Sequence, residues 1–159
     1  MNSGINVDYI NPFIEATIHT FQTMCSVTPV RTRLALKGKD EEVYGVCGII
    51  GLAGEATGAV VLNFPEQVAV AMVSTFVGET MTEISPAVMD GVGELANIIA
   101  GDARNRIMKK GYAFEIGLPK IVAGRSFVIG QNRSVPCLVV TYGSEFGSFS
   151  LEVSLKKGD

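Results

Sequence analysis

The sequence predicts an α+β fold, a two-layer sandwich in which long helices cover one face of a mostly antiparallel sheet. Segments with apolar residues at helical spacing alternate along the chain with segments in which every second residue is apolar. A capped helix followed by three strands occurs twice in this order, which indicates a weak internal duplication. With 159 residues, of which 47% are hydrophobic, the chain can bury a core of its own, and we expect one domain, 1–159.

The first half is expected to contain one helix and three strands. Asn11 and Pro12 combine an N-cap residue with the proline favoured at the first helical position, and "FIEATIHTFQTM" follows at helical spacing. The apolar residues then alternate, which predicts a half-buried strand over 30–37. "GKDE" and "GEAT" are typical of turns and predict further strands near 43–52 and 57–64. We expect these three strands to form an antiparallel meander.

Two more helices precede the second group of strands. Pro65 and Gly78 are typical of the two ends of a short helix. Ser85 and Pro86 predict the start of a helix of about 25 residues that runs to Gly111. The remaining strands are expected at 112–116, 120–130, 135–143 and 147–156.

The long helix contains an unusual segment, "DGVGELANIIAGDARNRI", residues 90–107. Around the helix axis, its apolar residues fall in one sector, the expected core face: Leu95, Ala96, Ile99, Ala100, Ala103 and Ile107. Its polar residues and one glycine form a stripe on the other side: Asp90, Glu94, Asn97, Gly101, Arg104 and Asn105. Because glycine costs about 1 kcal/mol relative to alanine in a helix and asparagine is also unfavourable, a requirement other than helix stability must select these residues.

The spacing of Asp90, Glu94, Asn97 and the distant Pro119 resembles the signature of the CheC/CheX/FliY family of chemotaxis phosphatases. In that signature an acidic residue or serine is followed by glutamate, then asparagine, and much later by proline. The order of helices and strands is also similar to the family's over about residues 8–156. The resemblance therefore implies a CheC-like fold.

The first helix holds no second copy of the Glu-x-x-Asn pair that CheC-type members carry in both halves. Three residues after Glu15 comes Ile18, which has no amide. One active centre is implied, and the chain is most similar to CheX-type members, which are typically homodimers. A strand such as 30–38 or 147–156 is expected to extend the sheet across a two-fold axis.

The resemblance implies a phosphatase that hydrolyses the aspartyl phosphate of a CheY-like response-regulator receiver domain. Asn97 is expected to position the attacking water, because a neutral carboxamide both accepts and donates hydrogen bonds. Glu94 is expected to pair with the lysine near the receiver's phosphorylation site. The receiver supplies its own Mg²⁺, so this chain is expected to bind no cofactor or metal. Supporting roles are expected for Asp90 and Pro119, and partner docking for Gly93, Gly101 and Arg104.

One alternative stays open, because the same fold resembles domains of flagellar switch proteins: a non-catalytic docking or adaptor module. Other classes are disfavoured by composition. A net charge of −3 without a basic cluster argues against nucleic acid. The absence of a long apolar run or a secretory signal argues against membrane insertion and favours the cytoplasm.

Metal and dinucleotide sites are also disfavoured. The three cysteines lie far apart, and His19 is the sole histidine, so neither a CxxC site nor a two-histidine site can be built. "GVGELA" formally fits a dinucleotide fingerprint, but it follows a helix start, whereas that fingerprint follows a strand.

Overall fold

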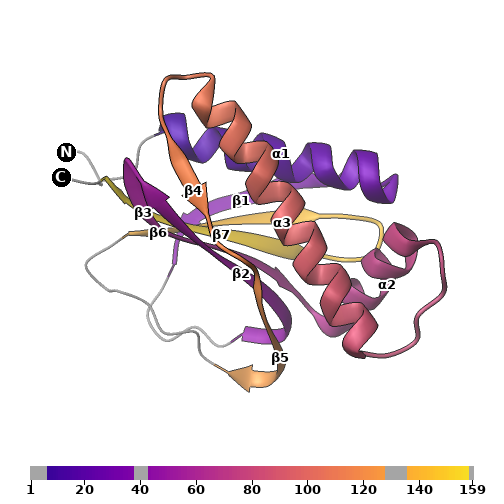
Figure 1. Ribbon diagram of the computed structural model, residues 1–159. Helices are drawn as coiled ribbons and strands as arrows, with labels where there is room; N and C mark the ends of the chain where they lie inside the picture. The colour runs from indigo at the N-terminus through magenta and orange to yellow at the C-terminus, as the bar shows by residue number, and fades with distance from the viewer. Residues whose placement is uncertain (1–6, 38–42, 128–135, 158–159) are drawn as a thin grey trace.

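The described part of the chain forms one antiparallel sheet with helices packed against one of its faces (Figure 1). The computed structural model describes residues 7–37, 43–127 and 136–157. In chain order the elements are α1 (Val7–Cys25), β1 (Val30–Leu36), β2 (Val43–Gly54), β3 (Ala56–Phe64), α2 (Glu66–Val77), α3 (Pro86–Met108), β4 (Phe114–Ile116), β5 (Lys120–Phe127), β6 (Cys137–Gly143) and β7 (Phe149–Lys157). Helices α1 and α3 pack against each other on the same face of the sheet, which confirms the expected α+β arrangement (Figure 1).

The strand order differs from the expected meander. Across the sheet the order is β1-β6-β7-β3-β2, and β4 and β5 both bind the outer edge of β2. In a meander β1 would pair with β2, but β4 and β5 occupy that edge of β2. β1 pairs with β6 instead. The second half repeats this exchange, since β5 pairs with β2 and not with β6. The two halves have matching layouts, and each contributes its first strand to the other.

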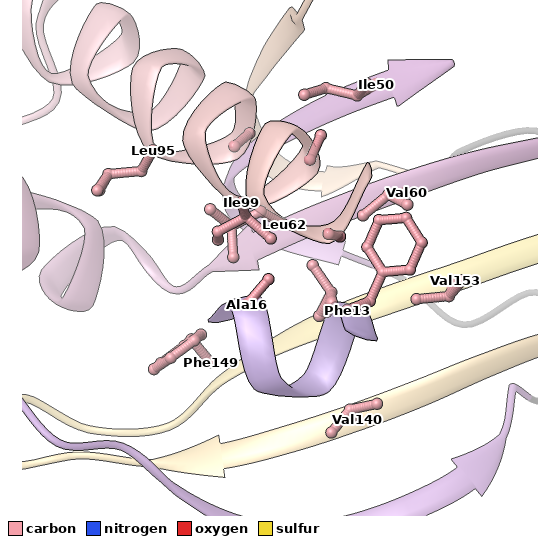
Figure 2. Close-up of a cluster of buried hydrophobic side chains, with 14 of the residues drawn as sticks. Phe13, Ala16, Ile50, Val60, Leu62, Leu95, Ile99, Val140, Phe149 and Val153 are labelled. Carbon is pink, nitrogen blue, oxygen red and sulfur yellow. The ribbon is translucent and has the colours of Figure 1, made fainter. Parts of the chain in front are cut away.

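The core lies between the helices and the sheet. Phe13 and Ala16 of α1 point towards the same buried cluster as Ile99 of α3, with Leu62 and Val153 of the sheet beside them (Figure 2). The predicted core face of α3 is confirmed, because all six of its residues are buried: Leu95, Ala96, Ile99, Ala100, Ala103 and Ile107. The packing thus fixes the rotation of α3 about its axis and turns the opposite stripe outward.

Helix α1 begins earlier than the sequence predicted. It starts at Val7, and Pro12 lies inside it, not at its first position. The preceding turn is buried: Tyr9 is 3% exposed, and its ring makes edge contacts with Tyr112 and Phe114 at centroid distances of 5.0 and 5.3 Å. Burial of this turn against the core offsets the cost of a proline within the helix.

The prediction of a half-buried strand over 30–37 was correct about the strand but wrong about its burial. Val30, Leu34 and Leu36 are 62%, 46% and 62% exposed. The reason is position, because β1 lies at the edge of the sheet and no residue of it belongs to the buried core. By contrast β7 lies between β6 and β3, so the stretch 147–156 has no open edge with which to extend the sheet.

Both later helices have the predicted caps. Gly78 closes α2 with φ 73°, and its N–H donates to the Ser74 carbonyl. Ser85 caps α3 through a hydrogen bond from the Val88 N–H. α3 ends at Met108, earlier than expected, because the following residues form a tighter turn. The "GKDE" turn and the predicted strand residues 128–130 and 135 lie outside the described residues.

A buried ion pair lies on the face of the sheet away from the helices. Lys37 Nζ is 2.8 Å from Glu152 Oε1, and the two side chains are 6% and 5% exposed. Glu152 alternates along β7 with Leu151 and Val153, which belong to the core on the helical face. The pair therefore lies across the sheet from α3.

Candidate functional site

The polar stripe of α3 faces outward between two flanks. α2 and α1 pack on one side of the helix, against its N-terminal and C-terminal halves, and β4 and β5 pack on the other side (Figure 1). Asp90, Glu94 and Asn97 are exposed, as the helical periodicity predicted. Within the described residues, neither Glu94 nor Asn97 makes a hydrogen bond or ion pair with another side chain. A carboxylate and a carboxamide therefore stand one turn apart on a rigid helix, available to an external partner.

Two glycines of α3 serve close packing. A Cβ at Gly91 would lie 2.5 Å from Val73 Cγ1 of α2. A Cβ at Gly93 would lie 2.9 Å from Ile121 Cδ1 of β5. The expectation that Gly93 forms part of an exposed docking surface is wrong, because the residue is buried against β5. Its missing side chain lets the strand approach the helix just before Glu94.

Pro119 lies beside α3, next to Gly93. A Cβ on Gly93 would be 3.7 Å from Pro119 Cγ, so the proline borders the turn of α3 that carries Glu94. The same connection between β4 and β5 is also held to the sheet, since the Gly117 N–H donates to the Gly51 carbonyl at 2.9 Å. The helix and the distant proline of the signature therefore lie close together in the fold.

In the C-terminal part of the stripe, the surface at Gly101 is open, whereas the side chain of Arg104 is already hydrogen-bonded within the fold. Nothing lies within 4 Å of a Cβ built on Gly101, so the surface there is low and accessible. Arg104, by contrast, donates from Nε to the Phe114 carbonyl. It is only partly exposed, and one of its donors already ties α3 to β4.

The opposite flank of α3 is held to α1 by charged side chains. Asp102 accepts from His19 Nδ1 at 3.3 Å and from Arg106 Nε at 3.1 Å. Arg106 also contacts Glu15 at 3.0 Å. Glu15, the one glutamate of α1 that could be compared with Glu94, is therefore engaged in holding the two helices together. Such partly exposed pairs contribute little free energy each, and their role here is orientation.

Other chemistries find no support in the described residues. No group of three or more histidine, cysteine, aspartate or glutamate side chains there could hold a metal ion, and none of the described helices is long and apolar enough to span a membrane. The three cysteines are buried and not disulfide-bonded. Burial raises the pKa of Cys25 to about 11 and that of Cys47 to about 12, so both thiols stay protonated at neutral pH.

Leu118, beside the stripe, is a candidate functional residue that the sequence patterns did not indicate. Leu118 is 91% exposed and immediately precedes Pro119. Its neighbours Gly117 and Pro119 indicated a loop, but an apolar residue in a loop has no periodicity from which exposure can be inferred. The packing of Pro119 beside Gly93 places Leu118 close to the polar stripe of α3.

Comparison with known proteins gives concordant matches. Residues 46–143, more than half of the chain, match the family model described as "Chemotaxis phosphatase CheX". A relative from Thermotoga maritima, described as "CheY-P phosphatase CheX", is 23% identical over 150 residues, which are 94% of this chain and 96% of the relative.

Solved structures show the same fold. A CheC-like superfamily protein from Shewanella sp. PV-4 has a TM-score of 0.89 and 28% identity, covering 96% of this chain and 99% of its own. A chain in the CheX-CheY-BeF3-Mg²⁺ complex from Borrelia burgdorferi has a TM-score of 0.82 and 24% identity, covering 96% and 100%. The fold is CheC-like, as the resemblance implied.

Proposed function

The chain belongs to the chemotaxis phosphatase CheX family, and we propose that it hydrolyses the aspartyl phosphate of a CheY-like receiver domain by means of Glu94 and Asn97. The observation that carries this proposal is the joint exposure of these two side chains, one turn apart on α3. The relative described as a phosphatase of phosphorylated CheY and the Borrelia complex of CheX with CheY support a receiver as the substrate. The reaction is proposed to occur in the cytoplasm.

Asn97 is proposed to position the water that attacks phosphorus. Its carboxamide oxygen accepts a hydrogen bond from the water and holds it in line with the bond to the receiver aspartate. As the new bond to phosphorus forms, the bond to the aspartate oxygen breaks, the aspartate leaves as a carboxylate and the phosphate takes up the water's proton. Mg²⁺ bound by the receiver would neutralise charge on the phosphoryl oxygens, so this chain need supply no metal.

Glu94 is proposed to fix the receiver in register. Its carboxylate can form a charge-assisted pair with a receiver lysine, while Asn97 reaches the phosphoryl group one turn further along the helix. Asp90 and Pro119 support the site from within the stripe and from beside it. The low surface at Gly101 allows the receiver to approach the helix closely.

Phosphate release from a panel of phosphorylated receiver domains tests the proposed function. We expect the wild-type protein to accelerate release from at least one receiver. Glu94→Ala should raise KM and lower kcat, because the mutation removes the ion pair that sets the register. Glu145→Ala, which removes an exposed carboxylate from the turn between β6 and β7, is the control and should change neither constant. Receiver binding without acceleration by the wild-type protein would instead support the adaptor alternative.

We also propose that the protein forms a homodimer through β1. Within the described residues β1 pairs on one side only, with β6, and its other edge can hydrogen-bond a second copy across a two-fold axis. Val30, Leu34 and Leu36 add exposed apolar side chains to this edge.

Light scattering after gel filtration tests this proposal. The wild-type protein should elute as a dimer, and the double variant Leu34→Glu/Leu36→Glu as a monomer, because adjacent copies would bring like charges together. Val7→Glu, at an apolar position on α1 that is at least as exposed, should remain dimeric. A monomeric wild-type protein would contradict the proposal.

A further inference from the structure

Leu118 is the most exposed of the large hydrophobic residues in the described part of the chain, at 91%. Single exposed apolar side chains are common on protein surfaces and alone indicate nothing. Leu118 differs in its position and in how firmly its backbone is held. Both features follow from contacts of its two neighbours.

The backbone on each side of Leu118 is anchored. On one side the Gly117 N–H donates to the Gly51 carbonyl of β2 at 2.9 Å. On the other side the ring of Pro119 fixes its own φ and lies against the Gly93 position of α3. The strands that enter and leave this connection, β4 and β5, both pair with β2. The leucine is therefore held outward on a short, supported connection, so little conformational entropy would be lost when it is buried by a partner.

The anchored connection lies beside the proposed catalytic turn. Gly93, which borders Pro119, is followed directly by Glu94, and one turn later by Asn97. Viewed down the helix axis, Asn97 lies between Glu94 and Gly93. Since Gly93 faces Pro119, the side chain of Asn97 is on the side of the helix nearer to the connection that carries Leu118. A receiver whose phosphoryl group reaches Asn97 must also approach this connection.

We propose that Leu118 is a docking residue that inserts into an apolar patch beside the phosphorylated aspartate of the receiver. This inference rests on the proposed function and adds a specificity determinant to it. Protein interfaces commonly combine an apolar centre with polar contacts at its rim, and Leu118 and the pair of Glu94 and Asn97 offer these two kinds of contact on neighbouring segments. Receivers with an apolar patch at this place are preferred over those with a charged one.

Binding of a CheY-like receiver loaded with BeF₃⁻ and Mg²⁺, measured by titration calorimetry, tests this role. The receiver is the one that the wild-type protein dephosphorylates fastest in the panel. Leu118→Ser should raise the dissociation constant by about tenfold or more, because most of a leucine side chain then loses its burial. Leu118→Met should restore binding to within about threefold of wild type. Val7→Ser, at an apolar position that is 65% exposed at the start of α1, is the matched control and should bind as the wild type does.

Steady-state kinetics and melting separate docking from a structural role. Leu118→Ser should raise KM and leave kcat and the melting temperature unchanged, since the side chain touches the partner and not the reacting atoms. A dissociation constant within twofold of wild type would overturn the inference while leaving the proposed function intact. Conversion of a dimer to a monomer by this variant would also overturn it, because the leucine would then cover a second copy. Failure of the proposed function itself would appear earlier, as a wild-type protein that accelerates no receiver.

Discussion

Replacing Asn97 with alanine is expected to lower the accelerated rate of receiver dephosphorylation by about 100-fold or more, because the attacking water loses the group that holds it in line. The side chain is exposed and makes no hydrogen bond among the described residues, so the fold does not depend on it. Alanine is also the better helix former, and the variant should be more stable by up to about 0.5 kcal/mol. Loss of activity together with a small gain in stability would show that Asn97 is selected for the site.

A matched control exists on the same helix. Asn105 is another exposed asparagine of the polar stripe, two turns beyond Asn97. Asn105→Ala should show the same small gain in stability and the full wild-type rate. Phosphate release measures the rates, and thermal melting measures the stability. An unchanged rate in Asn97→Ala would contradict the proposed mechanism, whereas equal losses in both variants would point to docking along the whole stripe.

The largest stability effect is expected from Lys37→Met, which should lower the free energy of unfolding by about 3–5 kcal/mol. Methionine fills a similar volume, but it removes the ammonium group that lies 2.8 Å from the buried carboxylate of Glu152. A loss of this size is a large fraction of the stability of an ordinary domain. Urea unfolding of the wild-type protein and the variant measures this loss in the free energy of unfolding. The rate of phosphate release by the folded variant should be unchanged, because the pair lies across the sheet from α3.

The double variant Lys37→Met/Glu152→Leu separates the ion pair from packing. Replacing both charged groups removes the buried carboxylate together with the ammonium group, so the double variant should be more stable than Lys37→Met alone. Lys156→Met, at an exposed lysine of β7, should change stability by less than about 0.5 kcal/mol. A cost for Lys37→Met no greater than that of the exposed control would contradict the assignment.

Much of the fold and the outward face of α3 could be predicted from the sequence. The apolar spacing of Leu95 and Ile99 determined which side of the helix is buried, and the rest of the helical wheel then placed Glu94 and Asn97 outside. Local periodicity suffices here because a helix that packs on a sheet buries one continuous face. The caps at Ser85 and Gly78 are likewise local signals.

Features that depend on distant neighbours could not be predicted. The alternating pattern of β1 is typical of a half-buried strand, but no local signal shows that it pairs with β6 at the edge of the sheet. The role of Gly93 was misassigned because the residue that fills its space, Ile121, comes from another element. The importance of Leu118 likewise depends on where Pro119 packs.

The exchange of first strands between the two halves also determines the order in which the molecule can be completed. β1 is made early, but its partner β6 is not available until most of the chain has been synthesised, since Leu36 pairs with Leu138. Neither half can assemble its full set of strands alone, so folding on the ribosome must wait for the last strands. Contacts between residues so distant in the sequence slow folding, and until β6 arrives the apolar side chains of β1 are a risk for aggregation with other nascent chains.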